Sequence, residues 1–313
     1  MTQLPVEPAW RLAERAEENR WLVAGLWSEQ AVGIVGGEPK CCKSFLALDL
    51  AVAVASGTPC LRRFAVSRAG RVLLFAAEDA LHIVRRRLEG IAAAAGVALA
   101  DLDIQVITAP TLRLDLDADR RSLAETVARL QPRLLILDPF VRLHRIDENA
   151  SGEVAPLLAY LRELQRRHGV AVLVVHHARK GGGARAGQAL RGSSEFHAWG
   201  DSNLYLRRDG ETLSLSVEHR AAASISPVTI ELAQRGDALA LEVADRREPT
   251  TPIAASLDER IVATLADADQ PLPFADLRAQ CRIRTATLRE RIGVLCANSR
   301  IVKIDGGYRV TGR

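Results

Sequence analysis

The hydrophobic positions of this chain form short apolar runs that alternate with amphipathic segments. Helical spacing of apolar residues marks 43–57, 83–95 and 153–169, and the first and last of these segments end at glycine. Runs of strand type are QAVGIVGG (30–37), GRVLLFAAEDA (70–80), DIQVIT (103–108), RLLILDPF (133–140) and VAVLVVHHARK (170–180). Strands that alternate with helices through about residue 180 predict an α/β fold with a mostly parallel sheet.

The pattern changes after residue 180. A loop rich in glycine and arginine leads into two predicted β-hairpins, at 202–220 with DG at its turn and at 229–245 with a GD turn. A stretch rich in proline and threonine, RREPTTPIAA, indicates a linker. We therefore predict four parts. Residues 1–30 form an N-terminal subunit-contact segment, with a short amphipathic helix and then a strand or turn, and residues 31–245 form an α/β core. A linker at 246–256 joins this core to a domain of three helices and a β-ribbon at 257–313.

Composition narrows the class of protein. The chain has 313 residues, of which 48% are hydrophobic, and no apolar run approaches the roughly 18 residues that a membrane span needs. Its N-terminus is charged and lacks the apolar region of a secretory signal. The five cysteines are odd in number and lack metal-ligand spacing, which favours a reducing compartment. We expect a cytoplasmic protein without a membrane partner.

The stretch VGGEPKCCKSF (35–45) has the outline of a phosphate-binding P-loop, G-x-x-x-x-G-K-[ST], between a predicted strand and helix. Lys43 would reach the β and γ phosphates of a nucleotide, and the Ser44 hydroxyl would ligate Mg²⁺. Cys42 replaces the second glycine; because it has a Cβ, we expect near-helical φ and ψ there. The predicted nucleotide-binding residues are Gly36, Gly37, Glu38, Pro39, Lys40, Cys41, Cys42, Lys43, Ser44 and Phe45.

Three more predicted strands end in polar residues. Asp138 ends one apolar run, as a Walker B carboxylate that holds the Mg²⁺ shell would, and Glu78 ends another, where a carboxylate can deprotonate the attacking water. His176 and His177 close a third strand, and alternation should turn one ring inward and the other toward the active edge. Ligands bind at this edge of α/β sheets, so ATP binding and hydrolysis are the expected chemistry.

Together these motifs resemble the RecA-like ATPases of the AAA family, and most closely the plasmid RepA-type hexameric replicative helicases. The matching stretches are the P-loop, FAAED, LILDPFVRLHRIDENASG, VLVVHHARKG and LRGSS, over roughly residues 20–230. The resemblance implies a homo-oligomeric, hexameric ring with ATP and Mg²⁺ at subunit interfaces. It assigns phosphate and metal binding to Lys43 and Ser44, the catalytic base to Glu78, the Walker B acid to Asp138 and the γ-phosphate sensor to His177.

This chain departs from the helicase pattern at the arginine finger, a residue that acts on the neighbouring subunit's ATP. Where the pattern offers an arginine after RGSS, this chain has WGDSN around Asp201. Arginines at the ends of predicted strands are the alternatives. We expect Arg220 to be the arginine finger, with Arg207 as the second candidate. Solvated surface charges are the competing interpretation.

Two segments are candidates for nucleic-acid binding. The glycine-rich loop carries four positive side chains and no acid, and in RecA-like rings the equivalent loop lines the central channel, so we expect single-stranded DNA there. The C-terminal domain fits a winged helix with a basic recognition helix near Thr285, which suits duplex DNA or, alternatively, protein docking. The candidate contacts are Arg179, Lys180, Arg185 and Arg191 in the loop and Arg282, Arg284, Arg289 and Arg291 in the C-terminal domain.

The leading hypothesis is thus an oligomeric ATPase that acts on DNA as a helicase or translocase. Two alternatives remain open: an ATP-switched DNA-binding regulator that uses the winged helix without unwinding, and an assembly platform that binds ATP without turning it over.

Overall fold

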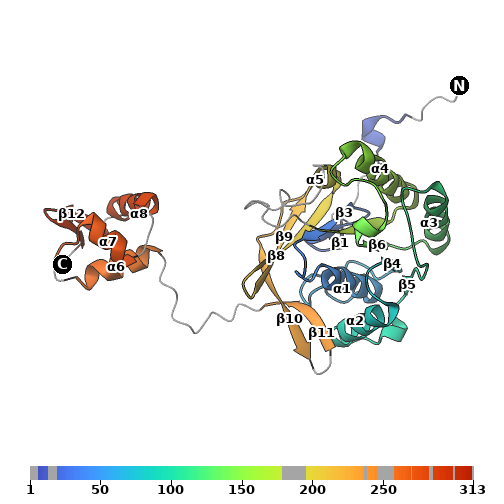
Figure 1. Cartoon of the computed structure of the whole chain (residues 1–313), viewed down its shortest axis with the longest axis horizontal. Helices are drawn as coiled ribbons and strands as arrows, with labels where there is room; N and C mark the ends of the chain where they lie inside the picture. Colours follow the sequence, from blue (N-terminus) through green and yellow to red (C-terminus); the bar gives the residue numbers. More distant parts are fainter. Residues whose placement is uncertain are drawn as a thin grey trace. The chain divides into compact units, whose positions relative to one another are not determined.

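A computed structural model of the chain describes residues 6–12, 20–177, 195–235, 238–244, 257–268, 270–281, 285–298 and 300–311. The chain divides into two compact units, residues 1–244 and 245–313, which are drawn in Figure 1 and described separately below.

The first unit is built on one sheet, which has nine strands among the described residues. Their order across the sheet is β11-β10-β9-β8-β3-β7-β6-β4-β5, and the strands from β8 to β5 run parallel while β9, β10 and β11 add antiparallel neighbours. The carboxyl ends of six strands therefore share one edge of the sheet. The bounds are β3 Val32–Gly37, β4 Val72–Ala76, β5 Ile104–Val106, β6 Leu134–Asp138, β7 Ala171–His177, β8 Ser202–Asp209, β9 Thr212–His219, β10 Val228–Arg235 and β11 Ala238–Val243.

Helices cover both faces of this sheet (Figure 1). On one face, α1 (Lys43–Ser56) and α2 (Leu81–Ala94) share a buried apolar core with the strands. On the other face, α3 (Asp117–Leu130), α4 (Ser151–His168) and the short α5 (Glu195–Trp199) pack over a second core. Because both faces are covered, the parallel strands read as continuous apolar runs instead of alternating ones.

Local signals explain where two of the helices end. Both α1 and α4 end at glycines with left-handed φ, Gly57 and Gly169, as their sequence predicted. The helix α3 was not assigned from sequence. It is polar along most of its length and buries only Leu123 and Val127, one turn apart, so its apolar signal is weak.

The N-terminal segment and the first hairpin differ in detail from expectation. Residues 9–11 form a single 3₁₀ turn, and β1 (Trp21–Val23) pairs with β2 (Trp27–Ser28), whereas most of the expected helix falls on 13–19, outside the described residues. In the hairpin β8–β9, Asp209 pairs with Thr212, so the two linking residues are Gly210 and Glu211 and not the predicted Asp-Gly.

The second unit contains α6 (Leu257–Ala266), α7 (Phe274–Cys281) and α8 (Thr285–Ala297), followed by the antiparallel pair β12 (Ile301–Ile304) and β13 (Gly307–Val310). This is the helix-helix-helix-ribbon order that the apolar pattern predicted. Ile261, Leu277 and Leu288 from the three helices share a small core of their own. The winged-helix assignment itself stays a prediction. No helix in the described part of the chain has both the length and the apolar character to cross a bilayer.

Gly33 in β3 gives a test of the sheet. A Cβ there would lie 1.7 Å from the Ser202 carbonyl oxygen, so Gly33→Ala must move backbone and should destabilise the first unit by about 3 kcal/mol. Gly152→Ala is the matched control, because open space surrounds that position in the first turn of α4 and alanine favours a helix. Denaturant unfolding measures both variants, and equal stability of the two would contradict this packing.

Candidate functional site

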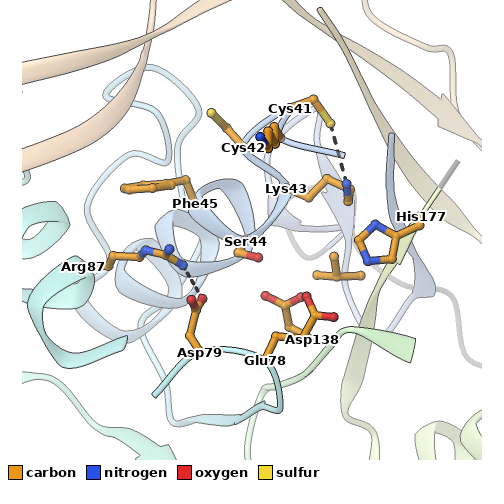
Figure 2. A pocket seen from close by; sticks show the side chains of 12 residues that line it. Cys41, Cys42, Lys43, Ser44, Phe45, Glu78, Asp79, Arg87, Asp138 and His177 are labelled. Carbon is orange, nitrogen blue, oxygen red and sulfur yellow. Dashed lines mark hydrogen bonds and ion pairs between the residues drawn. The ribbon is translucent and has the colours of Figure 1, made fainter. Parts of the chain in front are cut away.

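A cavity of about 330 Å³ lies at the edge where the parallel strands end (Figure 2). It is formed by the loop after β3, the first turn of α1 and the ends of β4, β6 and β7. The cavity therefore brings together segments that are far apart in the sequence. Its lining residues are Lys40, Cys41, Cys42, Lys43, Ser44, Phe45, Glu78, Asp79, Arg87, Asp138, Val175 and His177.

The loop between β3 and α1 has an unusual backbone at its glycine-replacing cysteine. Cys42 caps α1 with φ 63° and ψ 26°, a left-handed conformation, so the expectation of near-helical angles was wrong. This turn leads into the first residues of α1, which line the cavity, and the N–H groups of a helix's first turn have no partner within the helix and can bind an anion. Gly37 is required for another reason, because a Cβ there would lie 2.4 Å from the Leu206 carbonyl oxygen.

Lys43 is held inside the cavity by its own loop. Its Nζ donates a hydrogen bond to the Glu38 carbonyl oxygen at 2.7 Å and lies 3.8 Å from the Cys41 Sγ, and only 6% of the residue is exposed. Burial lowers the pKa of the Lys43 ammonium, an effect opposed by Cys41 and by the carboxylate of Asp138. A buried ammonium with few partners is a strong attractor for phosphate oxygens.

Asp138 and Ser44 supply hard oxygen ligands beside this lysine. Burial raises the pKa of Asp138 to about 6, and the hydrogen bond with Ser44 acts in the opposite direction. A hydroxyl and a carboxylate next to a phosphate site are the ligands that Mg²⁺ takes together with nucleotide oxygens. These residues fit a magnesium ion.

Two acids follow β4 and have different partners. Glu78 Oε1 accepts a hydrogen bond from the Arg142 Nε at 3.3 Å. Asp79 forms an ion pair with Arg87, whose guanidinium carbon lies 5.1 Å from the centre of the Phe45 ring (Figure 2). Glu78 points toward Asp138, and Asp79 toward the Phe45 side of the cavity.

The two histidines that end β7 point in opposite directions, as strand alternation predicted. His176 is 1% exposed and stacks on Phe196 with ring centres 4.1 Å apart. His177 lines the cavity and faces Lys43 (Figure 2). The structure thus brings His177, and not His176, to the predicted site.

Neither candidate arginine finger lines the cavity of its own chain, although Arg207 lies at the same edge of the sheet, because its neighbour Leu206 pairs with Gly37. Arg207 is exposed near the end of β8. Arg220 follows β9, whose last residue pairs with the first residue of β8, so it lies at the opposite edge of the sheet, where it contacts the Ala198 carbonyl oxygen and Asp201.

The candidate DNA contacts are only partly visible. Of those in the second unit, Arg291 forms an ion pair with Asp258 of α6, and Arg289 lies over the Phe274 ring at 5.9 Å, so each has a packing role there. The candidates that lie outside the described residues are Arg179, Lys180, Arg185, Arg191, Arg282 and Arg284.

Sequence reasoning missed several residues around the cavity. Asp79 and Arg87 line it, Arg142 contacts Glu78, and the Arg208 guanidinium lies 3.7 Å from the Cys42 Sγ. The only sequence signal for Asp79 was its place beside Glu78. The signal for Arg208 was its place beside Arg207 at a predicted strand end, whereas Arg87 and Arg142 could not be told apart from the arginines close to them in the sequence.

The sequence and the fold of this chain are similar to those of known proteins. A sequence model of the AAA domain family matches residues 2–183, which is more than half of the chain. The chain belongs to the AAA domain family. With its P-loop and strand-end acids, it falls among the AAA-type ATPases. Its assignment to the RepA-type branch stays a prediction.

A solved structure extends the comparison to the fold of this AAA protein. The chain is similar to a DnaB-like replicative helicase, studied together with its interactions with primase, with a TM-score of 0.53 and 12% sequence identity. The match covers 68% of this chain and 57% of the length of that helicase. Likeness at this identity concerns the fold alone, and it confirms the predicted RecA-like α/β core.

Cys42→Gly tests the left-handed turn. Glycine adopts this conformation without the Cβ clash, so the variant should be more stable by about 1 kcal/mol, measured by denaturant unfolding. Cys42→Ala is the control, because it removes the thiol and keeps the Cβ, and it should show no such gain. An equal gain in both variants would mean that the thiol, and not the backbone, is responsible.

Proposed function

We propose that this protein is an ATP-hydrolysing motor of RecA-like type that assembles into a homo-oligomeric, hexameric ring and acts on DNA as a helicase or translocase. One observation carries the proposal. The cavity at the carboxyl edge of the sheet holds a buried lysine, a hydroxyl, three carboxylates and a histidine, which come from α1 and from the ends of β4, β6 and β7.

Most of these side chains have roles that their positions support. Lys43 binds the β and γ phosphates, and Ser44 and Asp138 hold Mg²⁺, which neutralises phosphate charge when bound. Glu78 accepts the proton of the attacking water. His177 faces the lysine and contacts the γ-phosphate, and the residues after it carry the nucleotide state toward the segment we propose to bind single-stranded DNA.

The ring places each cavity at a subunit interface. A residue that acts on a neighbour's nucleotide must be unable to reach its own, and Arg220 meets this condition because it lies at the opposite edge of the sheet. We propose Arg220 as the arginine finger, with Arg207 as the second candidate. The DnaB-like replicative helicase with the same fold supports the class of motor.

The second compact unit supports an alternative function. Three helices and a hairpin with their own core could bind duplex DNA as a winged helix, while ATP controls assembly without unwinding. In that case DNA selection would depend on residues 257–313 and strand separation would be absent.

Substitutions in the cavity test the ATPase. Lys43→Ala should abolish ATP binding and turnover, whereas Glu78→Gln should keep binding and lower kcat by about 100-fold or more. Glu89→Gln is the control, since Glu89 pairs with Arg85 on the exposed side of α2 and should leave kcat unchanged. Turnover that survives Lys43→Ala would show that another site hydrolyses ATP.

Removal of the second unit separates the two functions. A chain that ends at residue 244 retains the whole cavity and should keep ATP hydrolysis that single-stranded DNA stimulates. ATPase and fluorescence-anisotropy measurements on the full and shortened chains check this. If all DNA binding disappears with the second unit, the ATP-switched regulator is the better description.

A further inference from the structure

The segment that follows β6 links the two sides of the catalytic machinery. This segment, residues 139–150, follows directly after Asp138 and starts with a 3₁₀ turn, Phe140–Arg142. Phe140 and Leu143 are fully buried, whereas Arg142 and Arg145 are exposed. The segment is therefore anchored in the core by its apolar residues and presents its cations to solvent.

Arg142 contacts the proposed base directly. Its Nε donates to Glu78 Oε1 at 3.3 Å, although the two residues are 64 positions apart in the chain. Side-chain exposure is 61% for Arg142 and 44% for Glu78, so water and other ions can reach this pair. An exposed pair of this kind is weak and is readily exchanged for a competing anion.

The other end of the segment lies beside the sensor strand. His144 Nε2 is 3.3 Å from Glu148 Oε1, and the His144 ring packs against Phe140 with centres 4.6 Å apart. Burial alone would raise the pKa of Glu148, but its interactions with His144, His176 and His177 bring this pKa below its usual value. The segment thus contacts the base at one end and the surroundings of the sensor at the other.

We propose that Arg142 is a positioning residue that restrains Glu78 in the resting protein, and that the phosphate backbone of single-stranded DNA, bound at Arg142 and Arg145, releases it. In hydrolysis Glu78 takes a proton from water as the water oxygen bonds to the γ-phosphorus and the bond from that phosphorus to the bridging oxygen breaks. A carboxylate oxygen that already accepts a hydrogen bond from a guanidinium N–H is less available to accept the proton of that water. The inference rests on the proposed function, because it assumes that Glu78 is the base.

The charges of the segment favour binding of a polyanion at Arg142 and Arg145. The acids of the segment already have partners, since Asp147 accepts hydrogen bonds from Asn149 and Glu148 lies against His144. The two exposed arginines are separated by only two residues, so successive phosphates of one strand could contact both. DNA and Glu78 then compete for the same guanidinium.

The test compares steady-state ATP hydrolysis by the full-length protein and by Arg142→Gln, each with and without oligo(dT). Loss of the restraint should raise the DNA-free kcat by about two- to fivefold, the range expected for an exposed ion pair, with KM for ATP unchanged. Stimulation by oligo(dT) should shrink by the same factor. Arg142→Lys should keep a low DNA-free rate, because a lysine can still pair with Glu78.

Arg85→Gln is the matched control. It breaks an exposed Arg–Glu pair of the same type, Arg85–Glu89 on α2, and should leave both kcat and its stimulation as in the parent protein. Thermal melting of all variants shows whether they remain folded.

The outcomes separate this inference from the proposed function. A DNA-free kcat in Arg142→Gln that does not exceed that of the parent overturns the restraint, even if Glu78→Gln shows that Glu78 is the base. A raised DNA-free kcat in a protein that oligo(dT) never stimulates supports the restraint and removes DNA as the releasing partner. Loss of activity in the folded Arg142→Gln variant would make Arg142 part of the catalytic machinery and also overturn the proposal.

Discussion

The parallel arrangement of β3, β7, β6 and β4 is the constraint on which the rest of this structure depends. Because these strands run in the same direction, the residues that follow them meet at one edge of the sheet. The order also inserts β7 between β3 and β6, so His177 enters the cavity between the segment that carries Lys43 and the acids at the ends of β6 and β4. No single segment carries this chemistry, and any error in strand order would disperse it.

Burial gives the assembled side chains their properties. Both the Lys43 ammonium and the Asp138 carboxylate are largely removed from water. This burial lowers the pKa of Lys43 and raises the pKa of Asp138, so it favours the neutral form of each group. Such groups gain more from a phosphate and a metal ion than exposed ones would, since the surrounding dielectric constant is low. The strained turn at Cys42 belongs to the same arrangement, because it leads into Lys43 and Ser44 at the start of α1, which line the cavity.

Much of the fold and the centre of the site could be predicted from sequence. Long apolar runs identified the parallel strands, and polar residues at strand ends pointed to Glu78, Asp138 and the pair His176 and His177, of which alternation places one in the site. Local patterns did not reveal what depends on tertiary packing. Helix α3 was missed because it buries so little, and Arg87 could not be told apart from Arg85 and Arg86 without knowing which side of α2 faces the cavity.

Two further features of the site could not be predicted from the sequence, for physical reasons. The conformation of Cys42 was predicted from the usual cost of a Cβ at positive φ, but the requirements of the loop outweigh that cost. The Arg142–Glu78 contact joins residues that are distant in sequence, and it became visible only when β6 and β4 were paired.

The central claim is that this cavity drives a motor on DNA. Its most direct test is strand separation: the purified protein is incubated with a forked duplex that carries a fluorophore and a quencher, with ATP or with a non-hydrolysable analogue, and the mass of the assembly is read on the same samples. The account predicts unwinding by a ring-sized assembly with ATP alone. Equal fluorescence with both nucleotides, from a protein that binds the duplex tightly, would contradict it.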